Sequence, residues 1–259
     1  MFVMNQISTK PIWVRNGGDL AKEFCKRVDQ QSEGADIVII GFEWYSDDSL
    51  KSMTWKSRNA KGKSKNRNDY VIEPDTDLTK RCMKDILGTT STKRTLTLLM
   101  NEAKTHLQNQ NIGYFIAGNG VSISSFPCDL TNNHSEGETA IILGLSTIFL
   151  RGKSVLEYGS DVDLFALLLA HYDNIDCANI VMKSLSGYTS IKAVHDFLGS
   201  NVASVLLAFH GLTGCDIAGK LCGKSKEFWT KKFLSERDDS EFIQALLTLL
   251  SSNHSEVVE

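Results

Sequence analysis

The sequence lacks the cysteine and histidine patterns that hold structural zinc. Its six cysteines are scattered along 259 residues, and none of them forms a C-x-x-C pair. No histidine pair stands at zinc spacing beside them, so a zinc-finger class is excluded. We therefore expect reduced, buried thiols at Cys25, Cys82, Cys128, Cys177, Cys215 and Cys222.

Long apolar runs are also absent. Residues 1–10 contain no apolar region long enough for a signal peptide, and no run approaches the roughly 18 residues of a membrane span. The sequence therefore predicts an intracellular protein without membrane association. The nucleus is a candidate compartment.

An excess of positive charge is missing from the chain as a whole. Lysine and arginine number 28 against 31 acidic residues, a formal net charge of −3, which excludes a generally basic protein. Positive charge is concentrated instead in residues 51–67, the basic arm, where no acid intervenes. Such an arm is either a solvated loop or a surface that contacts phosphates. Its basic members are Lys51, Lys56, Arg58, Lys61, Lys63, Lys65 and Arg67.

A complete phosphate-binding loop is not present. Residues 214–220 match the opening of the P-loop pattern, but Leu221 stands where a metal-binding serine or threonine is required. Residues 219–225 end in Gly-Lys-Ser and are one residue short between the glycines. A nucleoside triphosphatase is therefore not expected. A turn explains Gly118-Asn-Gly120, which lacks the third glycine of a dinucleotide fingerprint.

No serine or cysteine nucleophile stands at a spacing that pairs it with a histidine. His134 and His210 are available, but their spacing recommends no partner. We expect His171 and His195 to be packed or surface residues on helices, and Cys215 to be a small buried residue.

Alternating strand and helix patterns favour an α/β fold. A hydrophobic content of 42% is sufficient for a substantial core, and we expect one domain over residues 1–259. The alternation predicts three layers: a mostly parallel central sheet with helices on both faces, followed by a helical C-terminal extension at residues 200–250. The predicted strands are residues 35–42, 112–117, 154–158 and 179–184. The predicted helices are residues 17–31, 92–108, 138–150, 164–172, 190–198, 202–210 and 240–250, with another starting near Asp216.

The strongest chemical pattern is acidic. Glu136-Gly-Glu138, Asp161-Val-Asp163 and Asp216 recur at the ends of apolar segments. In extended backbone, carboxylates at i and i+2 project to the same side, so each doublet can direct two groups at one point. Asp161 and Asp163 follow the strand predicted at 154–158, and open α/β sheets bind ligands at the carboxyl ends of their strands. The alternative is that these acids cap helix amides.

Several convergent carboxylates suit divalent metal chemistry. Hard oxygen ligands favour Mg²⁺ or Mn²⁺, and several negative charges are needed to hold two such ions about 4 Å apart. Two ions of this kind activate water and stabilise a leaving oxygen in phosphodiester hydrolysis. A phosphatase with Asp161 as nucleophile is a weaker alternative, because it leaves Glu136, Glu138 and Asp216 without roles.

The order of these motifs resembles that of PIN-like and flap-endonuclease-like 5′ nucleases. It is closer still to the PIN-like domain of animal transposon-associated proteins, and the resemblance spans roughly residues 13–235. The matching stretches are Phe42-Glu-Trp-Tyr45, Ser49-Leu-Lys51 with Arg58, His134-Ser-Glu-Gly-Glu-Thr139, Asp161-Val-Asp163, Phe209-His-Gly-Leu-Thr-Gly-Cys-Asp-Ile217 and Cys222-Gly-Lys-Ser-Lys226.

The resemblance implies a PIN-like fold and a metal-dependent nuclease that acts on DNA or RNA. It implies metal ligands at Glu43, Glu136, Glu138, Asp161, Asp163 and Asp216, all but the first of them catalytic. It also implies that phosphates are contacted by the basic arm and by Lys220, Lys224 and Lys226.

Two positions depart from the family pattern. No acid occurs in residues 2–6, where the family's first strand carries an Asp-Gly pair, and Glu43 replaces an aspartate. The longer side chain moves the carboxylate by about one methylene, which matters because Mg²⁺ demands a near-ideal octahedron. Two hypotheses remain: a nuclease using Mg²⁺ or Mn²⁺, and a catalytically inactive nucleic-acid-binding or interaction module derived from one.

Overall fold

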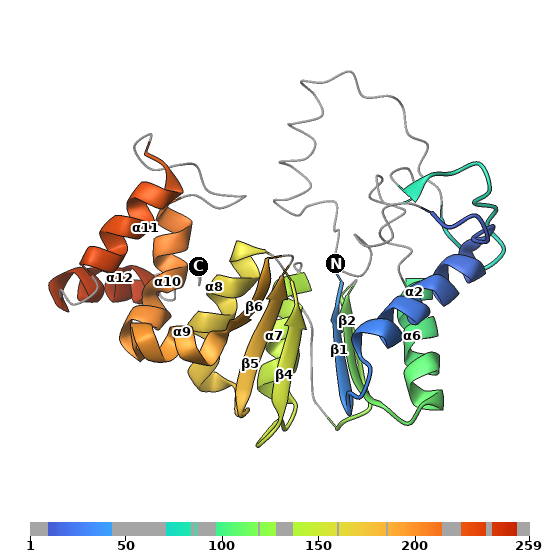
Figure 1. Cartoon of the computed structure of the whole chain (residues 1–259), viewed down its shortest axis with the longest axis horizontal. Coiled ribbons are helices and arrows are strands. Elements are labelled where there is room, and N and C mark those ends of the chain that lie inside the picture. The colour runs from blue at the N-terminus through green and yellow to red at the C-terminus, as the bar shows by residue number, and fades with distance from the viewer. Residues whose placement is uncertain are drawn as a thin grey trace, which may run out of the picture. The chain divides into compact units, whose positions relative to one another are not determined.

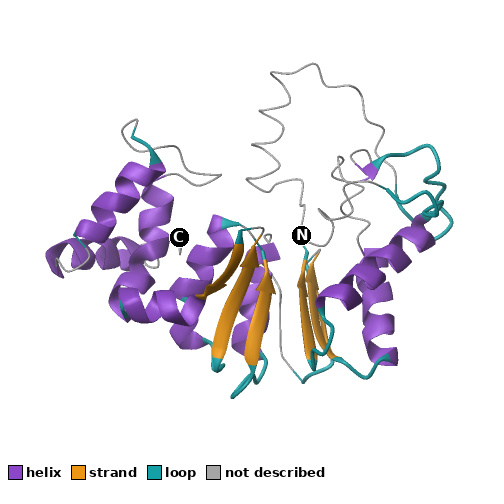
Figure 2. Ribbon diagram, in the orientation of Figure 1, coloured by secondary structure: helices purple, strands orange, loops and turns teal. Residues whose placement is uncertain are grey.

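The chain contains two compact units, Met1–Ile148 and Phe149–Glu259, each with its own small sheet (Figures 1 and 2). The computed structural model describes residues 10–42, 71–83, 86, 97–118, 120–127, 137–159, 161–184, 186–213, 224–236 and 240–252. Both units mix helices with strands, which confirms the α/β class. A single domain over residues 1–259 stays a prediction.

The first unit has a three-stranded mixed sheet with the order β1-β2-β3. β1 runs parallel to β2, and β2 runs antiparallel to β3. Helix α2 packs against α6, while α7 contacts β1 and β2. The elements are α2 (Gly17–Gln31), β1 (Ile37–Gly41), α6 (Thr97–Asn109), β2 (Gly113–Gly118), β3 (Val121–Ser124) and α7 (Gly137–Thr147).

Helix α2 shows how local sequence sets an element of this unit. Asn16 caps its N-terminus, because the side-chain oxygen accepts a hydrogen bond from the Asp19 amide at 2.8 Å. Leu20, Phe24 and Val28 recur at intervals of four residues and are all buried, so one stripe of the helix faces the core. Burial of a side chain such as Phe24 contributes about 1.5–3 kcal/mol.

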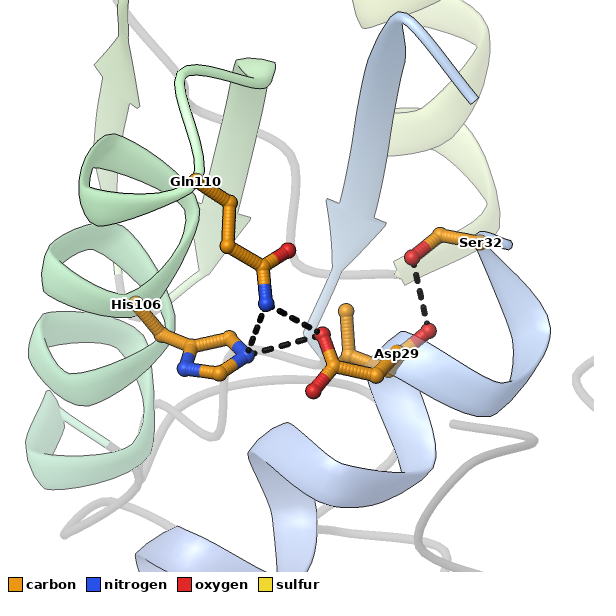
Figure 3. Close-up of polar contacts among 5 residues, drawn as sticks. Asp29, Ser32, His106 and Gln110 are labelled. Carbon is orange, nitrogen blue, oxygen red and sulfur yellow. Dashed lines mark hydrogen bonds and ion pairs between the residues drawn. The ribbon is translucent and has the colours of Figure 1, made fainter. Parts of the chain in front are cut away.

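A polar cluster joins α2 to α6 at the surface (Figure 3). His106 Nε2 lies 2.8 Å from Asp29 Oδ1, and Gln110 Nε2 lies 3.1 Å from that oxygen and 3.1 Å from the same ring nitrogen. One ring nitrogen cannot both donate to Asp29 and accept from Gln110. With the proton on Nε2, Asp29 accepts both bonds and ties the two helices together.

The second unit has a three-stranded mixed sheet with the order β4-β5-β6. β4 runs parallel to β5, and β5 runs antiparallel to β6. Helices α8, α9 and α10 pack on one another, and α9 contacts β5 (Figure 1). The elements are β4 (Ser154–Tyr158), α8 (Val162–Ala170), η1 (Tyr172–Asn174), β5 (Asn179–Ser184), β6 (Gly187–Ser190), α9 (Ile191–Leu198), α10 (Ser200–Thr213), α11 (Lys226–Ser235) and α12 (Ser240–Ser252).

The C-terminal helices have an aromatic core of their own. Phe209 of α10 stacks on Phe233 of α11 with ring centroids 4.4 Å apart. Val205 of α10 is fully buried in the same cluster, together with Ile243 and Leu246 of α12. These helices confirm the helical character predicted for the described part of residues 200–250.

Among the described residues, the predicted elements agree closely with the observed ones, while the helix start predicted near Asp216 lies outside the described residues. The helix expected at 17–31 and the strands expected at 154–158 and 179–184 match residue for residue. The expectation of a mostly parallel sheet is corrected, because two unpredicted strands return antiparallel after short turns. These are β3, which follows Gly120 at a φ of +73°, and β6, which begins at Gly187 at a φ of +132°. Gly120 thus belongs to the turn expected after the strand.

The cysteine prediction is right in one place and wrong in another. Burial raises the pKa of the Cys25 thiol to about 12, helped by the nearby charges of Glu102 and Asp29. Cys82 is exposed instead of buried, while Cys177 is half-buried. All three are free thiols, and the other three cysteines lie outside the described residues. None of the described helices is long and apolar enough to cross a membrane.

Helix α7 approaches the sheet at a glycine. A Cβ added at Gly144 would lie 2.6 Å from the ring of Phe115, which is fully buried. We therefore expect Gly144→Ala to lower the free energy of unfolding by about 1–3 kcal/mol through overpacking. Gly211 of α10 is the matched control, because no atom lies within 4 Å of an added Cβ. Gly211→Ala should stabilise the protein by up to about 1 kcal/mol. Equal effects in denaturant titrations would contradict this close approach.

Burial lowers the pKa of His171 at the end of α8 from its ordinary value of about 6.5. The folded protein then binds a proton less readily than the unfolded chain. His171 therefore contributes no pH dependence above about 6.5 and destabilises the protein as the pH falls below it. We expect the melting temperature to fall less steeply between about pH 6.5 and 5.5 in His171→Gln than in the wild type. Parallel pH profiles would contradict this assignment.

Candidate metal site at the start of helix α8

The junction between β4 and α8 presents Asp161. The strand ends at Tyr158, and the Gly159 amide donates to the Lys183 carbonyl of β5 at 3.2 Å. Asp161 has extended backbone, with φ −80° and ψ 133°, and its carboxylate accepts a hydrogen bond from the Asp163 amide at 2.9 Å. It is the N-cap of α8 and is exposed to solvent.

Asp163 lies in the first turn of α8 and pairs with a histidine from α10. Its Oδ1 lies 2.7 Å from His210 Nε2. The Asp163 side chain is 45% exposed, whereas that of His210 is 11% exposed. An ionised carboxylate only accepts, so the ring nitrogen carries the proton and donates. This contact links the start of α8 to the last turn of α10 and fixes the orientation of the Asp163 carboxylate.

The extended doublet expected from the sequence is corrected at Asp161-Val-Asp163. Only Asp161 has extended backbone, since α8 begins at Val162 and Asp163 is helical. The cause is the cap itself, because a carboxylate that bonds the amide two residues on starts a helix. Both acids still lie just beyond the carboxyl end of β4, as the sequence predicts.

Of the other predicted ligands, Glu138 alone lies among the described residues. Glu138 is half-buried in the first turn of α7, and it belongs to the first unit. Glu43, Glu136 and Asp216 lie outside the described residues. Within the described part of the chain, no group of three or more histidine, cysteine, aspartate or glutamate side chains could hold a metal ion.

Two of the predicted phosphate contacts lie at the start of α11. Ser225 caps this helix by accepting from the Phe228 amide at 3.2 Å. Lys224 is exposed, and its ammonium lies 5.3 Å from the centre of the Phe228 ring, while Lys226 begins the helix. The basic arm and Lys220 lie outside the described residues.

The chemistry of Asp161 and Asp163 fits Mg²⁺ or Mn²⁺. Both offer carboxylate oxygens, the ligand type that these hard cations prefer, and both are reachable from solvent. The recorded contacts use one oxygen of each carboxylate. A metal ion bound by Asp163 would have His210 as an outer-sphere partner that orients the carboxylate.

Comparisons with protein-family models, curated proteins and solved structures find no match to this chain. Its function is therefore inferred from its own residues and their geometry.

Sequence reasoning missed His210 as a member of this site. Asp163 and His210 are 47 residues apart, and no local spacing connects them. The packing of α8 against α10 brings them together. His195 is a packed residue as expected: it is buried, its ring centroid lies 4.9 Å from that of Tyr172, and Nε2 is 3.4 Å from Asp173. His171 is half-buried, in agreement with the same expectation.

The capping and ligand roles of Asp161 can be separated by two substitutions. Asp161→Ala removes the cap and should lower the free energy of unfolding by about 0.5–2 kcal/mol. Asp161→Asn keeps a side-chain oxygen of equal capping strength and should change stability by less than about 0.5 kcal/mol. Denaturant titration of both variants measures the difference. Equal destabilisation would show that the carboxylate charge, and not the cap, stabilises α8.

Proposed function

We propose that the chain is a divalent-metal-dependent nuclease with a three-layer PIN-like fold, which hydrolyses phosphodiester bonds in DNA or RNA. The observation that carries the proposal is the placement of Asp161 and Asp163 just beyond the carboxyl end of β4, with His210 bonded to Asp163. Ligand sites of α/β sheets lie at this end of their strands.

Each described residue has a separate role in the proposed mechanism. Asp161 and Asp163 bind metal through carboxylate oxygens, and His210 holds the Asp163 carboxylate in one orientation. Asp161 and Asp163 would hold a divalent ion there, and the chemistry it would supply is activation of water and neutralisation of phosphate charge. Glu43, Glu136, Glu138 and Asp216 are proposed to complete a site for two Mg²⁺ or Mn²⁺ ions, as the sequence resemblance implies.

The proposed substrate is a polyanion, so positive side chains are needed to position it. Lys224 and Lys226 flank the cap of α11 and are proposed to contact phosphates. Lys220 and the basic arm are proposed to do the same. Such contacts fix position along the backbone without reading sequence.

A second candidate function is a catalytically inactive module that binds nucleic acid. The observation that favours it is the missing acid in residues 2–6. Each carboxylate ligand that is lost lowers the affinity of the site for two divalent metal ions. This module would bind through the basic arm with strong salt dependence and would not cleave its ligand.

The test is cleavage of labelled single-stranded DNA, branched DNA and single-stranded RNA by the full chain in Mn²⁺. We expect Asp161→Asn and Asp163→Asn to reduce the rate by at least the 10–100-fold that loss of an outer-sphere partner costs. His210→Gln removes the outer-sphere partner and should reduce the cleavage rate by about 10–100-fold. Asp196→Asn is the matched control, since this exposed aspartate of α9 pairs with Lys192 away from the junction.

The outcomes separate the two candidate functions. Metal-dependent cleavage lost in Asp161→Asn and kept in Asp196→Asn supports the nuclease. Salt-dependent binding without turnover in Mg²⁺ or Mn²⁺ supports the inactive module. Cleavage unchanged by Asp161→Asn removes the proposed site.

A further inference from the structure

The sheet of the second unit has one face packed on helices and one face that is partly exposed, where Tyr158 and Lys183 are half-buried. Side chains alternate along a strand, so Ile180 and Met182 share one face of β5. Both are buried, and a Cβ added at Gly159 would lie 3.4 Å from Met182 and 2.9 Å from Leu164 of α8. This face therefore packs on the helices.

The opposite face of the sheet carries Leu156, Lys183 and Tyr188. Leu156 of β4 is 46% exposed and Tyr188 of β6 is 67% exposed. Leu156 pairs with Val181, and both share this face with Lys183 by strand alternation. Leu156 and Tyr188 lie on the two outer strands of this sheet, with β5 between them.

An aromatic-basic-aromatic row crosses this face in register. Tyr158 of β4 pairs with Lys183 of β5, which pairs with Tyr188 of β6. The Lys183 ammonium lies 5.0 Å from the centre of the Tyr158 ring and 5.5 Å from that of Tyr188. Cation–π attraction holds the charge between the two rings, so cation and rings form one preorganised row.

The two aromatic rings and the cation of this row suit a ligand that has both flat bases and phosphates. Aromatic rings stack on nucleobases of any sequence, and a cation held beside them attracts the phosphates that join those bases. Duplex bases are already stacked inside the helix and cannot reach such rings, whereas the bases of a single strand are free to do so. A purely apolar peptide would have to desolvate Lys183 in the middle of its contact.

We propose that the row of Tyr158, Lys183 and Tyr188 binds single-stranded nucleic acid by base stacking and phosphate contact. Tyr158 lies three residues before Asp161, so a strand held on the row would be led to the β4–α8 junction. The delivery of a bound strand to this junction rests on the proposed nuclease function. The inference adds that the substrate is single-stranded. Stacking does not distinguish the sugar, so DNA and RNA are both tested.

The test measures binding without cleavage, by fluorescence anisotropy of labelled oligo-dT and oligo-U in EDTA. Oligonucleotides of about 20 residues exceed the roughly 4–16 that one stacking platform covers. We expect Tyr188→Ala to weaken binding about 5–150-fold, the equivalent of the 1–3 kcal/mol that stacking contributes per base, and Tyr188→Phe to retain it. Lys183→Ala should reduce the slope of log affinity against log salt by about 0.7.

Two further variants keep the result interpretable. Phe197→Ala removes an aromatic ring that is 65% exposed on α9, away from the row, and should leave binding unchanged. Tyr188→Thr removes the ring but keeps a residue that favours strands, and should weaken binding as much as Tyr188→Ala. Thermal melts of all variants check that the fold is kept.

The outcomes also separate this inference from the nuclease itself. Failure of the wild type to bind either oligonucleotide overturns the inference, as does wild-type affinity in Tyr188→Ala and Tyr188→Thr. An equal loss in Phe197→Ala also overturns it. Binding that depends on Tyr188 and is kept in Asp161→Asn supports the row, even where cleavage in Mn²⁺ proves independent of Asp161 and the nuclease proposal fails.

Discussion

The hydrogen bond from the Asp163 amide to the Asp161 carboxylate is the constraint on which the candidate site depends. This bond ends the extended backbone that follows β4 and starts α8 one residue later. The start of α8 in turn sets the phase of the helix, which places Asp163 toward α10 and buries Leu164, Leu168 and Leu169. A helix begun one residue earlier or later would rotate by about 100° and turn Asp163 away from His210.

A cap and a metal ligand make compatible demands on one aspartate. The amide uses a single carboxylate oxygen, and the exposure of Asp161 keeps the group accessible. The N-terminal end of a helix also favours negative charge, so the position suits a carboxylate. The same amides compete with a cation for electron density on the carboxylate, so a capping ligand is expected to bind metal less strongly than a free one. Asp163 carries a similar cost, because its Oδ1 accepts from His210, and in return its carboxylate is held in one orientation.

The sheet of the second unit divides its two faces between stability and recognition. Burial of Ile180 and Met182 against helices supplies the apolar contacts that hold the unit together. The other face has no need of apolar residues for that purpose, and it carries Tyr158, Lys183 and Tyr188 in one cross-strand row. Because strand alternation separates the two sets, residues of the row can change without disturbing the core.

The amino-acid sequence by itself determined the local elements. The helix at 17–31 and the strands at 154–158 and 179–184 follow from short-range periodicity and caps, which depend on neighbours within a few residues. It also placed Asp161 and Asp163 at the end of a strand. Strands β3 and β6 escaped prediction because a four-residue strand carries little periodicity, and its direction is set by the turn before it. Tertiary structure alone decided that His210 contacts Asp163 and that Lys183 lies between two tyrosines, because helix packing and strand register bring together residues that no spacing along the chain relates.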